Sequence, residues 1–152
     1  MKRTHIWLGA ASAVFLLHGA YAASAEVPEI TVLKSPSCGC CMAWIEHLRA
    51  AGFEVQARDV TQDVLWAAKA QSGVTPEVSS CHTARIGSYV IEGHVPAQDI
   101  RRLLAERPEG LGLSVPGMPI GSPGMEMGDE REPYVTLRLK ADGSTDVFAR
   151  HD

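Results

Sequence analysis

Residues 30–41 read ITVLKSPSCGCC, and the fold that the sequence predicts is decided by this stretch. The β-branched run 30–33 is followed by Lys-Ser-Pro, which is typical of a strand that ends in a turn. The next residues have helical spacing, because apolar or small side chains recur three apart and a glycine follows as a C-terminal cap. These positions are Met42, Ile45, Leu48, Ala51 and Gly52. We therefore expect a strand, a turn that carries three cysteines, and a helix.

The alternation of strand and helix continues along the chain. Residues 53–58 alternate apolar and polar, which predicts a half-buried strand parallel to the first, and residues 62–72 predict a second helix. Two β runs, 84–86 and 89–92, meet at Gly-Ser and predict a tight hairpin, and a third helix begins at Pro96. The side chains expected to face inward are Phe53, Val55 and Ala57 on the second strand, Val64, Leu65, Ala67 and Ala68 on the second helix, and Ala97, Ile100, Leu103 and Leu104 on the third.

The resulting order, βαβα-ββα, is that of a thioredoxin-like α/β fold, whose redox motif also lies between the first strand and the first helix. Residues 109–128, EGLGLSVPGMPIGSPGMEMG, are rich in Gly, Pro and Met and predict an irregular loop of functional importance. Its methionines, Met118, Met125 and Met127, are either thioether ligands or adaptable packing residues. A terminal β-hairpin is expected over 134–150, because Asp-Gly forms a tight turn between two β runs.

The N-terminus predicts export. A basic start, an apolar run over 6–17 and two A-x-A patterns indicate a signal peptide over residues 1–25, followed by a single domain over 26–152. Loss of Lys2 and Arg3 reduces Lys+Arg from 14 to 12 against 18 acidic residues, so the mature charge is −6. This balance offers no electrostatic footprint for nucleic acid. We expect a periplasmic protein without stable membrane insertion after cleavage.

The four cysteines, Cys38, Cys40, Cys41 and Cys81, are the candidate functional residues. A helix N-terminus favours thiolates and lowers thiol pKa values. A disulfide within C-x-x-C closes too small a loop to stabilise the fold much, and a dithiol pair of Cys38 and Cys41 leaves Cys40 without a role. A closed zinc site requires well-separated ligand pairs. Crowded sulfurs are better suited to Cu(I), which thiolate and thioether ligands select.

Cys81 lies just ahead of the predicted hairpin, near the position where thioredoxins carry a cis-proline. A sulfur at this position would join the other three, so Cys81 is expected to be the fourth ligand. The role of His82 is open between ligand, hydrogen-bond donor to a ligand and solvated loop residue. His94 is expected to cap or pack, and His47 to be solvated. A thiol–disulfide oxidoreductase that uses Cys38 and Cys41, and a structural zinc module, remain alternatives.

Several segments resemble one known family in the same order: KSPSCGCC (34–41), SSCHT (79–83), YVIEGHVP (89–96), RRLL (101–104) and VPGMPIGSPGME (115–126). They resemble the exported metal-binding family, long labelled a domain of unknown function, that is typified by the copper-resistance protein CopG. The resemblance covers about residues 28–150.

The resemblance implies a thioredoxin-like periplasmic protein of copper resistance that acts together with copper-efflux or copper-carrier proteins. The implied copper ligands are Cys38, Cys40, Cys41 and Cys81, with shared sulfurs able to hold a small Cu(I) cluster. It further implies a copper oxidoreductase activity that interconverts Cu(I) and Cu(II). His82, His94 and the loop methionines lie within matching segments, but the resemblance assigns them no role.

Overall fold

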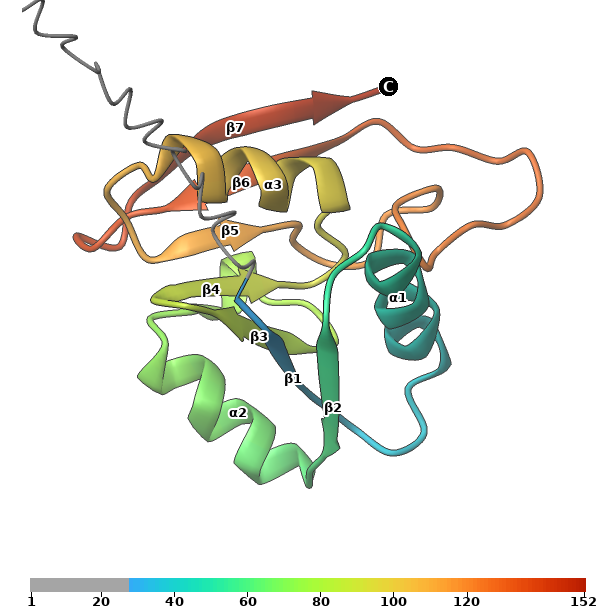
Figure 1. Cartoon of the computed structure of the whole chain (residues 1–152), viewed down its shortest axis with the longest axis horizontal. Coiled ribbons are helices and arrows are strands. Elements are labelled where there is room, and N and C mark those ends of the chain that lie inside the picture. The colour runs from blue at the N-terminus through green and yellow to red at the C-terminus, as the bar shows by residue number, and fades with distance from the viewer. Residues whose placement is uncertain (1–27) are drawn as a thin grey trace, which may run out of the picture.

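The computed structural model describes residues 28–152 (Figure 1), and the predicted signal peptide over 1–25 lies outside this range. The predicted order of elements between residues 30 and 106 agrees with the structure. The elements are β1 (Ile30–Lys34), α1 (Gly39–Ala50), β2 (Val55–Asp59), α2 (Gln62–Gln71), the 3-10 turn η1 (Pro76–Val78), β3 (Thr83–Ile86), β4 (Tyr89–Glu92), α3 (Ala97–Glu106), β5 (Gly112–Ser114), β6 (Tyr134–Leu139) and β7 (Thr145–His151). None of the helices in the described range has both the length and the apolar character that crossing a bilayer requires.

The seven strands form one mixed sheet in the order β2-β1-β3-β4-β5-β6-β7. β1 is parallel to β2 and antiparallel to β3, and in the second pair Leu33 lies opposite Thr83. The C-terminal end of β1 and the N-terminal end of β3 therefore lie side by side at the same end of the strands. This arrangement brings the turn that leads into α1 close to the segment that precedes β3.

The helices cover the two faces of the sheet unequally. α1 and α3 pack on one face, where Trp44, Ile45 and Leu48 form a buried cluster with alternate residues of β1, β3 and β4. The neighbouring residues of these strands face α2, since Leu33 of β1 and Thr83 of β3 line one pocket together with Ala68 of that helix. Alternation along a strand therefore decides which helix a side chain meets.

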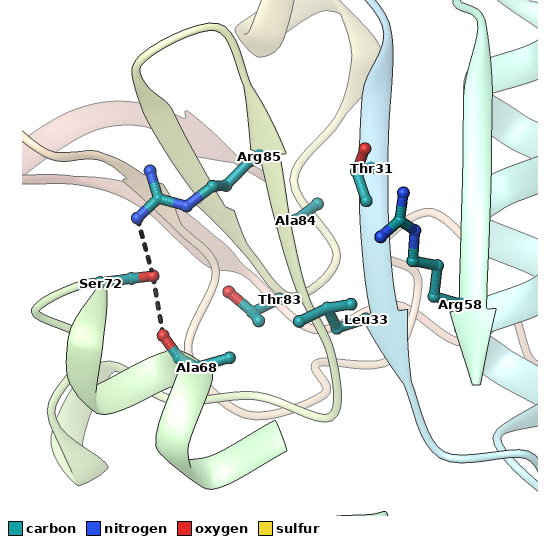
Figure 2. Close-up of a pocket in the computed structure, with 8 residues that line it drawn as sticks. All are labelled: Thr31, Leu33, Arg58, Ala68, Ser72, Thr83, Ala84 and Arg85. Atoms are coloured by element: carbon teal, nitrogen blue, oxygen red, sulfur yellow. Dashed lines mark hydrogen bonds between the residues drawn. The ribbon is translucent and has the colours of Figure 1, made fainter. Parts of the chain in front are cut away.

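A pocket of about 330 Å³ opens between α2 and the sheet (Figure 2), on the α2 face. Its lining contains neither cysteine nor histidine, so this pocket is separate from the candidate ligands. The lining residues are Thr31, Leu33, Arg58, Ala68, Ser72, Thr83, Ala84 and Arg85.

Some inward positions were predicted wrongly. Val64 and Ala67 of α2 are exposed, whereas Lys69 on the same helix is only 1% exposed. Ala57 is also exposed and lies on β2, the edge strand of the sheet. Met42, predicted on the apolar face of the first helix, is exposed as well, whereas the remaining expected inward residues of the helices are buried or half-buried.

The predicted irregular loop contains a strand. Residues of β5 pair in parallel with β4 and antiparallel with β6, and so join the terminal hairpin to the rest of the sheet. Gly112 is required in this strand, since a Cβ there would lie 1.8 Å from the carbonyl oxygen of Val90. The segment 115–133 beyond β5 has no strand or helix and crosses toward the start of α1.

Candidate metal centre

The start of α1 positions three cysteines: Cys38 directly precedes the helix, whereas Cys40 and Cys41 lie in its first turn and not in the preceding turn where the sequence placed them. Cys38 is the N-cap residue of α1, and its sulfur atom accepts a hydrogen bond from the backbone N–H of Cys41 at 3.3 Å. Cys38 and Cys41 are joined in a disulfide, with their Cα atoms 5.3 Å apart. Cys40, between them, is a free thiol.

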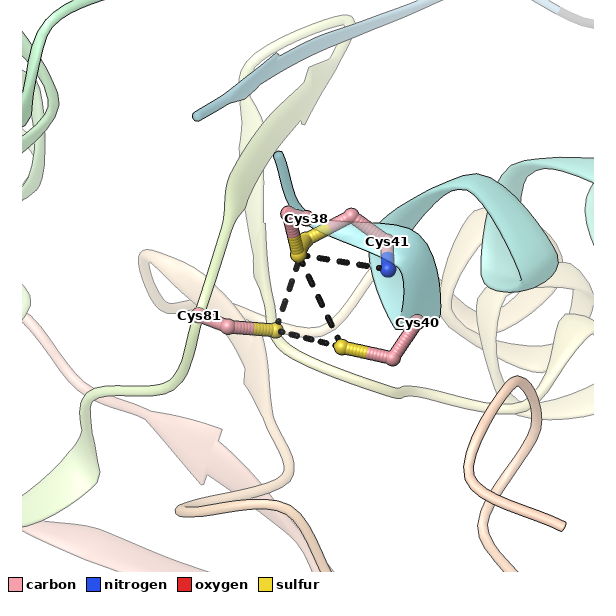
Figure 3. A group of neighbouring side chains, drawn as sticks. All are labelled: Cys38, Cys40, Cys41 and Cys81. Atoms are coloured by element: carbon pink, nitrogen blue, oxygen red, sulfur yellow. Dashed lines mark hydrogen bonds between the residues drawn. A yellow bond between two sulfur atoms is a disulfide. The ribbon is translucent and has the colours of Figure 1, made fainter. Parts of the chain in front are cut away.

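The fourth cysteine reaches this turn from the segment before β3 (Figure 3). The Cys81 sulfur atom lies 3.5 Å from that of Cys41 and 3.8 Å from that of Cys40, and the Cys38 and Cys40 sulfurs are 3.6 Å apart. All four sulfur atoms lie within 4.8 Å of one another. The structure thus brings the four predicted ligands together, while metal binding by them stays a prediction.

His94 belongs to the same site, although the sequence suggested only capping or packing. Its Nε2 atom lies 3.1 Å from the Cys81 sulfur, and its Nδ1–H donates to the carbonyl oxygen of Pro123 at 2.8 Å. Burial lowers the pKa of His94, so the ring is neutral near pH 7 with its proton on Nδ1. The Nε2 lone pair therefore faces Cys81, and Pro123 fixes this orientation as the outer partner of a ligating histidine does.

His82 is a second buried imidazole beside Cys81. Its Nδ1 atom lies 3.3 Å from the Cys81 sulfur, and its ring packs on Trp44 with 4.4 Å between the centroids. Burial, with the nearby His94 and Lys69, lowers the pKa of His82 well below its usual value. Its Nε2 atom is buried and has no hydrogen-bond partner among the described residues. One ligand atom from each of Cys81, His82 and His94 lies within 4.8 Å of the other two. Cys81 therefore belongs both to this group and to the group of four cysteines.

The charge of Cys81 depends on what binds it. Burial, followed by the neighbouring Cys40, raises the pKa of Cys81 to about 12. Without a cation the group is therefore a thiol, and a metal ion that binds it must displace its proton.

The histidine on α1 has a structural contact. His47 is half-buried, and its Nε2 atom accepts a hydrogen bond from the backbone N–H of Ala97 at 3.2 Å. The prediction that His47 is solvated is therefore wrong, because α3 begins against this side chain.

The segment 115–128 contacts both halves of the site. Gly117 donates its backbone N–H to the carbonyl oxygen of Ser79, two residues before Cys81. Gly124 packs on the first turn of α1, where an added Cβ would lie 2.7 Å from the carbonyl oxygen of Cys40. Two of the loop methionines, Met118 and Met127, are exposed, and Met125 is half-buried.

The donor set fits a thiophilic metal ion. It offers four sulfur atoms and two neutral imidazole rings, and no carboxylate belongs to either ligand group. Oxygen-seeking ions such as Mg²⁺ and Ca²⁺ have no suitable ligands here. Sulfur and imidazole donors suit copper and zinc, and adjacent sulfurs favour Cu(I).

Comparisons with known proteins agree with this chemistry. A solved structure titled "Copper resistance protein copG- Form 2" is 44% identical, with a TM-score of 0.77, and the match covers 84% of this chain and 100% of that one. The chain belongs to the CopG family. A second structure, "Copper resistance protein copG- Form 1", is also 44% identical, with a TM-score of 0.77 and coverage of 83% and 98%. The family model "Protein of unknown function, DUF411" matches residues 78–125, and no curated protein matches.

The contact of His94 with Cys81 has a signal in the sequence of this CopG-family member. In the β3–β4 hairpin Thr83 lies opposite Glu92. Counting two residues outward along each strand from this pair reaches Cys81 and His94. The register around the Gly-Ser turn could therefore have predicted that these two residues face each other.

Proposed function

We propose that this CopG-family chain is a periplasmic copper-resistance protein that binds Cu(I) through Cys38, Cys40, Cys41 and Cys81. The observation that carries the proposal is the meeting of two extra sulfurs, Cys40 and Cys81, 3.8 Å apart beside the C-x-x-C pair. A dithiol exchange site needs two sulfurs, whereas shared low-coordinate binding of a soft ion makes use of all four. The printed titles of the two structural relatives support copper as the ion.

Two further parts of the proposal concern fold and location. We assign a thioredoxin-like fold to residues 30–106, supported by the strand order β2-β1-β3-β4 and by the cysteines at the start of α1, the helix that follows β1. We assign the periplasm as the location, supported by the basic start, the apolar run and the A-x-A patterns of residues 1–25.

The proposal includes a change of copper oxidation state. The Cys38–Cys41 pair is a two-electron couple: oxidation of the dithiol forms one S–S bond and releases two electrons and two protons. These electrons suffice to reduce two Cu(II) to two Cu(I). The disulfide form leaves Cys40 and Cys81 free, beside the nitrogen donors of His82 and His94. Imidazole nitrogen suits Cu(II) better than thioether or thiolate clusters do.

The binding proposal is tested with reduced protein that lacks residues 1–25, titrated anaerobically with Cu(I) against a competing chelator. We expect the Cys40→Ser, Cys81→Ser double variant to lose more than about tenfold in affinity, since two sulfur ligands are absent. A loss of tenfold or less would overturn the proposal. Metal analysis of protein purified from copper-supplemented cells should show copper, and zinc in its place would favour the structural zinc module.

A thiol–disulfide oxidoreductase is the second candidate function. The observation in its favour is the Cys38–Cys41 disulfide at the start of α1, which is the position that such enzymes use. This function predicts reduction of an insulin-type substrate that survives Cys81→Ser but is abolished by Cys38→Ser. Copper binding instead predicts that both variants weaken Cu(I) binding, so the two substitutions distinguish the candidates.

A further inference from the structure

The segment that carries Cys81 is irregular, yet it is held at defined points. It runs from η1 to β3, and the carbonyl oxygen of His82 accepts the backbone N–H of Gly93 at 3.2 Å. Ser79 accepts the backbone N–H of Gly117. Between these contacts, the backbone N–H of Ser80 donates to the side chain of Glu92, Oε1, at 2.7 Å.

Glu92 is unusual for its position. It is the last residue of β4 and is fully buried, 0% exposed, on the face of the sheet that α2 covers. Its Oε1 atom accepts both from Ser80 and from the ammonium group of Lys69. Lys69 comes from α2 and is itself 1% exposed. A buried ion pair of this kind is weak support for stability, because desolvation offsets the Coulomb attraction.

The ion pair lies directly behind the candidate ligands. Thr83 is opposite Glu92 in the hairpin, so the two side chains share the α2 face. His82, one residue earlier, faces α1 and packs on Trp44. Glu92 therefore binds the segment before β3 from the α2 face of the sheet. The Cys81 sulfur and the His82 ring lie on the opposite face, beside α1.

The fit between the segment and β4 is close. A Cβ added at Gly93 would lie 2.5 Å from the Cβ of Ser80 and 2.6 Å from the carbonyl oxygen of Val115. Glycine at this position lets the segment approach the strand closely enough for the Ser80 N–H to reach the Glu92 carboxylate. The position of Ser80 in turn determines where Cys81 begins.

We propose that Glu92, oriented by Lys69, is a positioning residue that holds Cys81 in place to meet the sulfurs of α1 before any metal binds. The inference rests on the proposed function in one respect, namely that Cys81 is a copper ligand. Its physical basis is preorganisation: a segment without helix or strand costs conformational entropy to order, and the Ser80–Glu92 hydrogen bond orders it in the folded, metal-free protein.

Two double variants separate positioning from charge. Lys69→Met with Glu92→Gln removes both charges but keeps an amide oxygen that accepts the Ser80 N–H. Lys69→Met with Glu92→Leu removes both charges and the acceptor. Because both partners are replaced, neither variant leaves a lone buried charge, and Lys69→Leu with Glu92→Leu substitutes for the second pair if that pair does not fold. Thr136→Val is the control, since it removes a buried hydrogen bond between β6 and Asp99 of α3.

The first readout is Cu(I) affinity of the reduced protein by chelator competition. We expect about a 10- to 100-fold loss in the leucine pair, the range found for outer partners of metal ligands. The glutamine pair and Thr136→Val should remain within about threefold of the parent protein. The inference is overturned if the leucine pair keeps its affinity, or if the glutamine pair or Thr136→Val loses as much as the leucine pair does.

The second readout needs no metal. Hydrogen exchange of the Ser80 amide, measured by NMR on the metal-free protein, should be at least about tenfold faster in the leucine pair than in the glutamine pair. Equal exchange would overturn the positioning role. If the parent protein bound no Cu(I), the proposed function would fail while the exchange comparison still decided the role of Glu92, so the two failures are distinguishable.

Discussion

The sulfur atom of Cys81 lies 3.5 Å from that of Cys41, although the two residues are 40 positions apart. Antiparallel pairing of β1 with β3 produces this proximity, because the residues after β1 and those before β3 lie at the same end of the two strands. A C-x-x-C turn at the start of a helix thereby acquires additional sulfur from a distant segment. A dithiol exchanger needs only the C-x-x-C pair, so the additional sulfur favours the copper-binding proposal.

Oxidation of the Cys38–Cys41 pair should control Cu(I) binding. We expect the disulfide form to bind Cu(I) more than about 100-fold more weakly than the reduced form, since it lacks two of the four sulfur ligands and a metal ion binds thiolate rather than disulfide sulfur. Chelator competition on both forms measures this difference. A thiol-reactive dye should count two free thiols before reduction and four after it. Equal affinity of the two forms would contradict the prediction.

Acid should destabilise the metal-free protein. The pKa values of His82 and His94 are lowered by burial, so below about pH 6.5 the unfolded chain binds protons that the folded protein does not. The free energy of unfolding therefore falls with decreasing pH, by up to about 1.4 kcal/mol per pH unit for each histidine. Urea unfolding between pH 7.5 and 6, with a metal chelator present, measures the slope.

A variant isolates the histidine contribution to this slope. Burial raises the pKa of Glu92, and this shift makes the free energy of unfolding increase as the pH falls. The wild-type slope therefore does not report the histidines alone. His94→Gln removes one titrating group and should flatten the curve on the acid side. An unchanged slope in this variant would show that His94 titrates equally in the folded and unfolded states.

The contact of the Met-containing loop with α1 should depend on the absence of a side chain at Gly124. An added Cβ there would lie 2.6 Å from the backbone nitrogen of Trp44, and φ is +86°. Gly117 has a similar φ of +68° but nothing within 4 Å of an added Cβ. We expect Gly117→Ala to cost about 1–2 kcal/mol from the left-handed backbone. Gly124→Ala should cost about 1–3 kcal/mol more from steric overlap.

Urea unfolding measures both alanine variants, and limited proteolysis reports whether residues 115–128 detach from α1. Faster cleavage in Gly124→Ala than in Gly117→Ala is expected. If the two variants have equal stability and equal cleavage rates, the loop does not pack on α1 as described.

Removing one partner of the buried ion pair should be costly. Lys69→Met leaves Glu92 charged or forces it to take up a proton in an apolar setting, and we expect a loss of about 3–5 kcal/mol. The side chain of Lys140 is 37% exposed and pairs with Asp146. Lys140→Met should therefore lower the free energy of unfolding by about 1 kcal/mol or less. Urea unfolding at pH 7 compares the two variants. Similar small losses would indicate that Glu92 is solvated or already neutral.

The elements between residues 30 and 106 could be predicted from the sequence because their signals are local. Periodicity of apolar residues, Pro36 before α1 and Gly52 after it determine where a helix forms, whatever lies nearby. The three clustered cysteines are likewise visible without a structure. The prediction of a soft-metal site starts from this cluster.

Burial and contact across the sheet depended on the tertiary structure. On α2, Val64 is exposed although it was expected to face inward, and Lys69 is buried because it pairs with the carboxylate of Glu92 where α2 meets the sheet. The strand β5 forms in a Gly-rich segment because β4 and β6 supply hydrogen-bond partners on both sides. Local propensity depends only on residues that are close in the sequence, so it does not reveal such partners.

The sequence by itself determined the kind of donor atoms and the helix start that carries three of them. The sequence also predicted that Cys81 joins them, but only the tertiary structure decided that His94 faces Cys81, with the His94 tautomer set by Pro123. The physical reason is that local sequence signals specify only how one stretch of the chain folds. Strand order and register, which arise from the packing of the whole sheet, determine which stretches meet.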